Sequence, residues 1–296
     1  MNKKIYFVNQ FEHDSFLKNA LTLKGSVTPR VIKKVMFVFL YSCLISIINY
    51  AAPSVFLPIG PFEYAGLVMG LILVFRLNAG YDRWWEARKI WGNIVNQSIN
   101  LAIIISNYVL TDDSDNEKLK IINYIVAMPF LVKNSLRSID SVDDIKHLVE
   151  KTDLLKIMKS ENKPVILSSM IAHELNKFRN QNQLDNFAFL QAEEARALIL
   201  DCHGACERIL KTPIPFVMAV KSRRFIFLFL IALPFATVST SIYITPFITG
   251  VVAYALLSLD QIGVELQNPF SQERLSHLPL NNICSNIEKN IGSIPL

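Results

Sequence analysis

Few side chains in this sequence of 296 residues stand in a pattern that could support catalysis or metal binding. Cys202, His203 and Cys206 have helical spacing, but a closed zinc site needs four ligands, and we expect them to pack one helix face. The sequence has no phosphate-binding glycine loop, dinucleotide fingerprint or hydrolase elbow. Its apolar stretches offer only Glu63 and, at an edge, Asp260 as acidic groups. These features predict no enzyme, no metal and no cofactor, and they favour passive conduction or scaffolding.

One apolar pattern has the spacing of a helical stripe. Leu67, Leu71 and Phe75 recur every four residues beside Gly66 and Gly70, small residues that let helices approach closely. Such a stripe can simply face lipid. Where several copies of one helix surround an axis, it can instead form a hydrophobic constriction that gates ions by dewetting. Spacing alone leaves both interpretations open.

The distribution of charge predicts the elements that hold this stripe. The chain is 51% hydrophobic and 19% charged, whereas soluble proteins average about 25% charged residues. Residues 35–75 carry one charge, on Glu63, and residues 225–259 carry none. A transmembrane helix needs about 20 apolar residues, so each stretch is long enough for two. Turn-forming residues lie near the middle of each stretch, namely Pro53, Pro58, Gly60 and Pro61, then Ser239, Thr240, Ser241, Thr245 and Pro246.

We therefore predict an all-α membrane protein with four transmembrane helices in two hairpins. The helices cover residues 35–53 and 61–79, and then 225–242 and 246–262. The corresponding division of the chain is an N-terminal segment 1–34, a hairpin 35–79, a helical domain 80–222, a hairpin 223–264 and a C-terminal segment 265–296.

The middle domain is predicted to be helical throughout. The second span continues as a helix to about residue 110, and the polar residues 111–119 form a loop. Further helices are predicted over residues 119–139, 141–160, 164–179 and 184–211. Pro213 and Pro215 end the last of these, because proline cannot continue a regular helix.

Basic residues predict the orientation in the membrane. The net charge of +5 lies wholly in residues 1–34, which hold seven basic and two acidic side chains, so no basic stripe points to nucleic acid. Lys33-Lys34, Arg76 and Arg223-Arg224 flank the spans on one side, and the turns inside the hairpins carry no Lys or Arg. Both termini and the middle domain should therefore be cytoplasmic, where Cys202, Cys206 and Cys284 stay as free thiols, whereas Cys43 lies inside a span. Asp260 needs a basic partner or a water-filled crevice.

Four short segments occur together along the chain. They are Tyr81-Asp82-Arg83-Trp84-Trp85-Glu86, Gly204-Ala205-Cys206-Glu207-Arg208-Ile209, Thr212-Pro213-Ile214-Pro215-Phe216 and Glu265-Leu266-Gln267-Asn268-Pro269-Phe270. With the two hairpins, they make nearly the whole chain resemble the bestrophin family, in its bacterial branch. The resemblance implies a homopentameric ion channel, with four transmembrane helices per subunit around one axial pore that continues into a helical cytoplasmic domain. It also implies a bacterial inner-membrane location.

The resemblance assigns a role to the apolar stripe. The family's narrow neck is lined by three hydrophobic side chains, one per turn, that end eight residues before the Arg of Arg-Trp-Trp. Counting back from Arg83 reaches Phe75, Leu71 and Leu67. A second, cytoplasmic aperture falls on Phe187 by ungapped counting, and an error of one turn would choose Leu184 or Leu190 instead. The other matching motif residues are expected to be structural, with Arg83 and Glu86 in an ion-pair network.

The sequence indicates the conduction path more clearly than it indicates the permeant ion. Animal members of the family pass chloride, whereas bacterial relatives have been associated with monovalent cations. Glu63, Glu193 and Glu194 would favour cations if they face the axis, so we lean to small monovalent cations and keep an anion channel as the alternative. After Asn268-Pro269-Phe270 this chain lacks the acidic run that clasps calcium in animal members, so no calcium activation by that route is expected. A non-conducting membrane scaffold is a further alternative.

Overall fold

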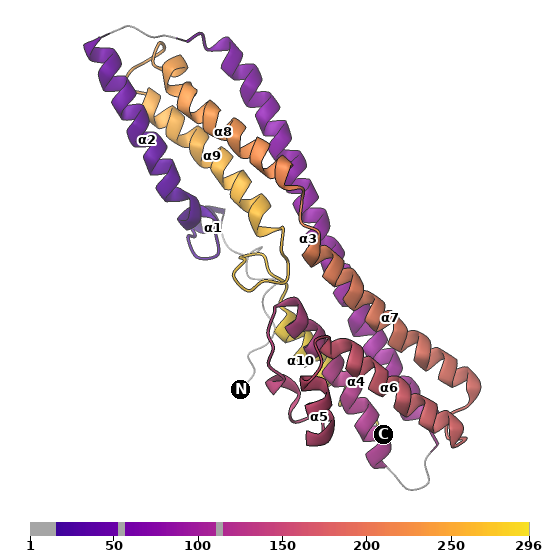
Figure 1. The fold of residues 1–296 in the computed structure, drawn as a ribbon. Helices are drawn as coiled ribbons and strands as arrows, with labels where there is room; N and C mark the ends of the chain where they lie inside the picture. Colours follow the sequence, from indigo (N-terminus) through magenta and orange to yellow (C-terminus); the bar gives the residue numbers. More distant parts are fainter. Residues whose placement is uncertain (1–15, 53–56, 111–114, 296) are drawn as a thin grey trace. The chain divides into compact units, whose positions relative to one another are not determined.

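The computed structural model describes residues 16–52, 57–110 and 115–295, and within these ranges every regular element is helical. The predicted N-terminal segment therefore lies in part, and Pro53 wholly, outside the described residues. The helices are α1 (Phe16–Ala20), α2 (Thr28–Ala51), α3 (Gly60–Tyr108), α4 (Asp115–Leu136), a 3-10 turn η1 (Asp143–Ile145), α5 (Lys151–Met158), α6 (Lys163–Asn180), α7 (Asn186–Lys211), α8 (Phe216–Thr237), α9 (Thr245–Glu265) and α10 (Leu280–Ile291) (Figure 1).

The chain divides into two compact units. The first comprises Met1–Gly80 and Ile214–Glu265, and the second comprises Tyr81–Pro213 and Leu266–Leu296. Helix α3 belongs to both, because it continues without a break for 49 residues. This confirms the prediction that the second apolar span runs on as a helix well beyond the charged residues that follow it.

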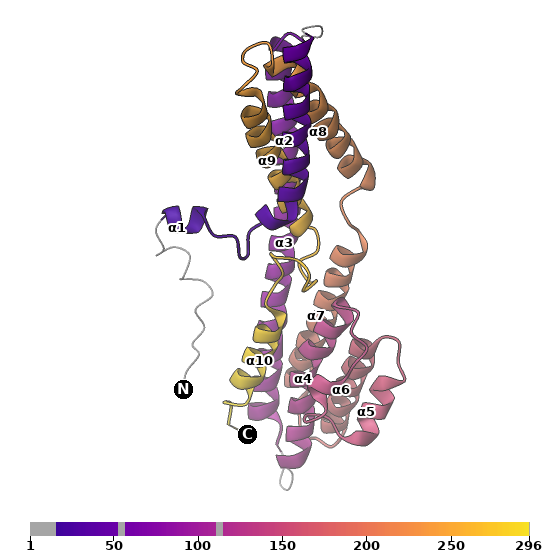
Figure 2. The same cartoon turned by 90° about the vertical axis from the view of Figure 1, so that its left-hand side faces the viewer.

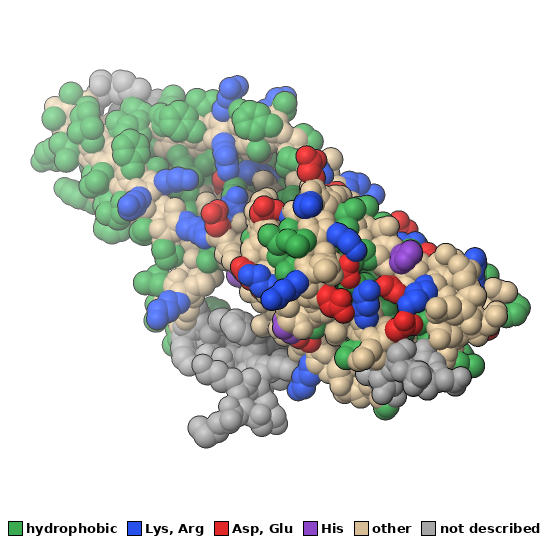
Figure 3. All heavy atoms as spheres, turned by 60° about the horizontal axis from the view of Figure 1, so that its bottom comes forward, with side chains coloured by type: hydrophobic (Ala, Val, Ile, Leu, Met, Phe, Trp, Pro, Cys, Tyr) green, Lys and Arg blue, Asp and Glu red, His purple; other side chains and the backbone are tan. Residues whose placement is uncertain are grey.

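The helices of the first unit carry hydrophobic side chains on their packed faces and also on their exposed faces. Helices α2, α8 and α9 lie side by side (Figures 1 and 2), and a small core joins them to α3 through Met69 and Leu73. Large apolar side chains on the outer face of α2 stay exposed, among them Leu40, Leu44 and Ile47. Figure 3 shows such hydrophobic side chains gathered over one part of the surface. Apolar patches of this extent are typical of surfaces that meet lipid or other proteins.

Polar contacts inside the first unit are those of helices that pack in lipid. The Ser42 hydroxyl donates to the Thr249 hydroxyl at 3.3 Å, and both residues are buried between α2 and α9. Small hydroxylated residues allow close helix approach and bond across the interface where no water is available. The pair joins the predicted first and last spans directly.

Among the described residues, three helices are long and apolar enough to cross a membrane, namely α2, α3 and α9. Helix α8 carries Lys221, Arg223 and Arg224 near its start, and its uncharged part, residues 225–237, has 13 residues. That part is shorter than the roughly 20 residues of a span. Because α8 packs beside α9 and α2, the fourth span stays a prediction.

The second unit is a helical bundle with a continuous core. Helices α4, α6, α7 and α10 pack together, and the core includes Trp91, Tyr124, Phe178 and Phe270. Asp185 begins α7 as its N-cap, since its carboxylate accepts the backbone N–H groups of Phe187 and Ala188 at 2.8 and 3.1 Å. The predicted helices over 119–139, 164–179 and 184–211 are confirmed as α4, α6 and α7.

Three predicted boundaries were wrong. Helix α8 was expected to end near residue 242, but it ends at Thr237. At this end, the Thr237 and Ser239 hydroxyls donate hydrogen bonds to carbonyls of the last turn. The predicted loop 111–119 is shorter, because α4 begins at Asp115, and residues 111–114 lie outside the described ranges. Instead of the single helix expected over 141–160, the structure has η1 followed by α5. Ile145 in η1 is buried, and Asp144 forms an ion pair with Lys133 at 2.6 Å.

Candidate functional site

The stripe on α3 faces away from the rest of its unit. The exposed fractions of Leu67, Leu71 and Phe75 are 75%, 56% and 58%. On the opposite side of the same helix, Met69 and Leu73 are 1% exposed and pack against α8 and α9. The subunit by itself therefore leaves three large apolar side chains uncovered, one per helical turn. Lipid, a neighbouring copy or a water-filled axis must be what they meet.

The two glycines beside the stripe differ in their surroundings. A Cβ added at Gly66 would make an ordinary van der Waals contact with the ring of Phe229 on α8, at 3.6 Å. A Cβ at Gly70 would meet nothing within 4 Å. Gly66 thus lies beside α8 within the subunit, whereas the space at Gly70 is open. Glu63 is exposed, one turn before Leu67 on the same side of the helix.

A buried ion pair follows the stripe by one residue. Arg76 is 1% exposed and donates to the carboxylate of Asp260 on α9. Arg223 of α8 lies at 3.3 Å from the second oxygen of the same carboxylate. The expected basic partner of Asp260 is therefore confirmed, and it is a pair of arginines. By its place in the sequence Arg76 is only a charged flank of the span, and its burial follows from its position beside Asp260 in the fold.

Arg83 binds backbone carbonyls instead of a carboxylate. Its guanidinium donates to the carbonyls of Ile209, Thr212 (2.6 Å) and Gln267 (3.3 Å). The first two are at the C-terminal end of α7, where carbonyls have no partner within the helix. Of the expected ion-pair network, Glu86 is paired with Arg208 at 2.9 Å, whereas Arg83 bonds to these carbonyls. Arg83 thus joins α3 to two segments that are distant in the sequence, the end of α7 and the backbone at Gln267.

Replacing Arg83 by alanine is expected to destabilise the second unit by about 2 kcal/mol, because it removes charge-assisted hydrogen bonds to three carbonyls. Thermal unfolding of the purified protein in detergent measures the loss. Arg88→Ala is the matched control, because Arg88 is an exposed arginine on the same helix. Equal unfolding temperatures for the two variants would show that the guanidinium of Arg83 does not hold these segments.

The remaining motif residues of the sequence have structural positions. The Trp84 indole N–H donates to the Ser276 carbonyl at 2.6 Å, and Trp85 is half-exposed beside it, with near-parallel rings 6.4 Å apart. Pro213 follows the end of α7, and Pro215 is the N-cap of α8. The two prolines thus separate the helices as predicted.

The Asn268-Pro269-Phe270 segment forms a tight turn at the edge of the second unit. The Asn268 side-chain oxygen accepts the backbone N–H groups of Phe270 and Ser271 at 3.1 and 3.3 Å, which is an Asx turn. The Pro269 carbonyl accepts from Leu278 at 2.7 Å, and Phe270 is fully buried. Arg137 adds a bond to the Phe270 carbonyl at 3.1 Å. These contacts assign the segment an architectural role in the described structure.

The candidates for the cytoplasmic aperture differ in exposure. Phe187, in the first turn of α7, is 84% exposed, and Leu190 is 61% exposed. Leu184 is 2% exposed within the core of the second unit and has no free surface to offer. Of the acidic side chains on α7, Glu193 pairs with Arg196 at 2.7 Å within the same helix, and Glu194 is exposed.

Burial shifts the pKa values of a cysteine and a histidine on α7. Burial raises the pKa of Cys206 to about 12, and it lowers the pKa of His203, which is 2% exposed. The Cys206 thiol is therefore protonated near neutral pH. Within the described ranges, no three His, Cys, Asp or Glu side chains converge as metal ligands.

Comparisons with known proteins assign the chain to a family. Residues 9–293 match the model of the bacterial/fungal bestrophin protein family. A voltage-dependent anion channel-forming protein of Synechocystis is 32% identical over 93% of this chain and 90% of its own length. One from Escherichia coli O157:H7 is 30% identical over 92% and 89%.

Solved structures agree with this assignment. A bacterial bestrophin homolog from Klebsiella pneumoniae is 29% identical, with a TM-score of 0.79 over 88% of this chain and all of the other. A point mutant of the same homolog gives a TM-score of 0.81 at 27% identity, over 88% of this chain and 98% of the other. The chain therefore belongs to the bacterial/fungal bestrophin family, and it is a membrane ion channel and not an enzyme.

Proposed function

We propose that copies of this chain form a homopentameric channel in the bacterial inner membrane, through which small monovalent ions pass passively along an axis lined by α3. The observation that carries the proposal is the exposure of Leu67, Leu71 and Phe75 opposite a buried face of the same helix. An oligomer built around α3 would turn these side chains toward one another. In this arrangement both termini lie in the cytoplasm, as the basic flanks indicate.

The chemistry of the neck makes it a gate. Rings of Leu and Phe side chains present no oxygen or nitrogen to replace the hydration shell of an ion. Ions pass such rings only where they are wide enough to remain wet, so hydration of the neck controls conduction. Ion preference must then come from charged or polar groups outside the neck. We further propose Phe187 as the apolar side chain of a cytoplasmic aperture, with exposed Leu190 as the alternative.

Anions are the first candidate for the permeant ion. The relatives from Synechocystis and Escherichia coli carry the name of voltage-dependent anion channel-forming proteins. This support outweighs the slight cation preference that the sequence suggested, since Glu193 is already paired with Arg196. Cations remain the second candidate, because Glu63 is exposed one turn before Leu67 and would place negative charge at the outer mouth.

Currents across a planar bilayer under asymmetric NaCl test this function. We expect unitary currents that reverse near the equilibrium potential of chloride, because a pore selective for one ion carries no net current at the equilibrium potential of that ion. Reversal near the sodium potential, shifted toward chloride by Glu63→Gln, would favour cations. Intact oligomers that carry no current would contradict the channel and support a membrane scaffold.

A further inference from the structure

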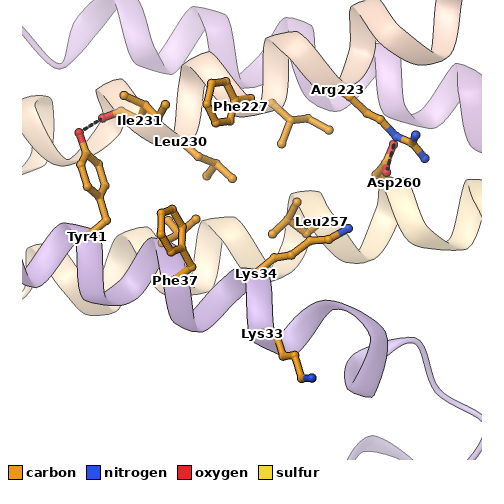
Figure 4. Close-up of a pocket in the computed structure, with 12 residues that line it drawn as sticks. Lys33, Lys34, Phe37, Tyr41, Arg223, Phe227, Leu230, Ile231, Leu257 and Asp260 are labelled. Atoms are coloured by element: carbon orange, nitrogen blue, oxygen red, sulfur yellow. Dashed lines mark hydrogen bonds and ion pairs between the residues drawn. The ribbon is translucent and has the colours of Figure 1, made fainter.

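A groove of about 710 Å³ lies in the first unit, bordered by α2, α8 and α9. Its walls are apolar over most of their length, with Phe37 and Tyr41 on α2 facing Leu230 and Ile231 on α8 (Figure 4). The Tyr41 hydroxyl donates to the Ile231 carbonyl at 3.2 Å and bridges the two helices there. The groove takes no part in the conduction path proposed above, since the stripe on α3 does not line it.

Basic side chains gather at the opposite end of this groove. Lys33, Lys34 and Arg223 line it there (Figure 4). Both lysines are exposed, and neither has an ion-pair partner within the described chain. Arg223 is about half-exposed, and it shares the single carboxylate of Asp260 with Arg76. Three basic side chains therefore line this end of the groove with one carboxylate, which is also paired with the buried Arg76, and the end has a net positive charge.

The charged and apolar parts follow one another along the helix axes. Lys33 and Tyr41 are eight residues apart on α2, and Arg223 and Ile231 are eight apart on α8, which is about 12 Å of helix in each case. The groove thus runs from a basic end into a hydrophobic trough along two adjacent helices. A small soluble anion would use the charges and leave the trough empty. A neutral lipid would fill the trough and leave the charges unpaired.

We propose that this groove binds one anionic phospholipid of the bilayer. The phosphate lies among Lys33, Lys34 and Arg223, and one acyl chain lies against Phe37 and Ile231. Charge complementarity selects this occupant, because basic groups at the end of a transmembrane helix attract anionic headgroups. The membrane itself supplies the ligand. The site does not depend on the role of Leu67, Leu71 and Phe75, so it stands or falls separately from the proposed neck.

Lipid retention measures this site. The full-length protein is reconstituted in vesicles of phosphatidylcholine and phosphatidylglycerol, extracted in mild detergent, and its bound lipids are counted by native mass spectrometry of the intact oligomer. We expect wild-type subunits to retain phosphatidylglycerol in preference to phosphatidylcholine. Lys33→Gln with Lys34→Gln should lower that retention about tenfold, since it removes both exposed lysine charges from the basic end of the groove.

A matched variant separates this site from general attraction of basic residues to anionic lipid. Lys221 and Arg224 are exposed near the start of α8, and neither lines the groove. Lys221→Gln with Arg224→Gln removes the same charge and should leave retention unchanged. Ile231→Trp keeps every charge and fills the trough, and we expect it to lower retention of phosphatidylglycerol as well.

Three results would overturn the proposal. Equal loss in the Lys33/Lys34 and Lys221/Arg224 variants would reduce the effect to surface charge. Displacement of the lipid by excess glycerol 3-phosphate would identify a soluble phosphate site. Loss of the oligomer in the Lys33/Lys34 variant, with no lipid retained by the wild type, would show that a neighbouring subunit covers the groove. All three results are measured by lipid retention and oligomeric state, so none of them requires a current through the channel.

Discussion

Replacing Leu67, Leu71 and Phe75 together by alanine is expected to raise ion flux through the reconstituted protein about tenfold or more, since a barrier lower by about 1.4 kcal/mol gives a tenfold rate. The three side chains are the uncovered face of α3. Truncating them widens and wets the constriction that they would form around an axis. Because none of them carries charge, the reversal potential should stay the same while conductance rises.

Flux from liposomes and reversal potential in bilayers measure the two quantities. The matched control is Leu40→Ala with Leu44→Ala and Ile47→Ala, which removes three exposed apolar side chains from the outer face of α2. If the stripe on α3 only faces lipid, both triple variants will behave alike. Unchanged flux in the α3 variant, with intact oligomers, would therefore reject the neck.

Features that depend on local composition were accessible from the sequence. The charge gaps predicted the apolar parts of α2, α3 and α9, because the cost of placing charge in lipid acts on composition alone. Pro213 and Pro215 predicted the break between α7 and α8, because proline lacks the backbone N–H that a helix interior needs and disfavours the helical conformation of the residue before it. The continuation of α3 followed from apolar residues spaced three and four apart.

Features that depend on which segments meet in space were not accessible. Arg83 bonds to carbonyls 126 and 184 positions away, and its charge suggested a carboxylate partner instead. Counting along the chain could not choose among Leu184, Phe187 and Leu190, whereas burial separates Leu184, which precedes α7, from the exposed Phe187. Whether Leu67 faces an axis depends on surfaces between copies, which no pattern within one chain contains. The neck and the aperture therefore remain proposals.

Removing the charge of Asp260 should have the largest effect on stability. Asp260→Asn leaves the guanidinium of Arg76 buried at 1% exposure without a counter-charge, and an uncompensated buried charge costs about 3–5 kcal/mol. Arg223 loses the same partner, but it is about half-exposed and water can solvate it. We therefore expect a large fall in the unfolding temperature of the detergent-solubilised protein, together with a smaller yield of oligomer.

Two further variants test whether the buried charge of Arg76 causes the loss of stability in Asp260→Asn. Glu86→Gln breaks the exposed pair with Arg208 and should cost less than about 1 kcal/mol, because water screens surface ion pairs. Arg76→Met with Asp260→Leu replaces the buried pair by apolar side chains and should recover most of the stability lost in Asp260→Asn. If the double variant is as unstable as Asp260→Asn, the loss comes from altered packing between α3 and α9. Recovery would instead show that the pair stabilises the junction only as a unit, directly behind the stripe that we propose as the neck.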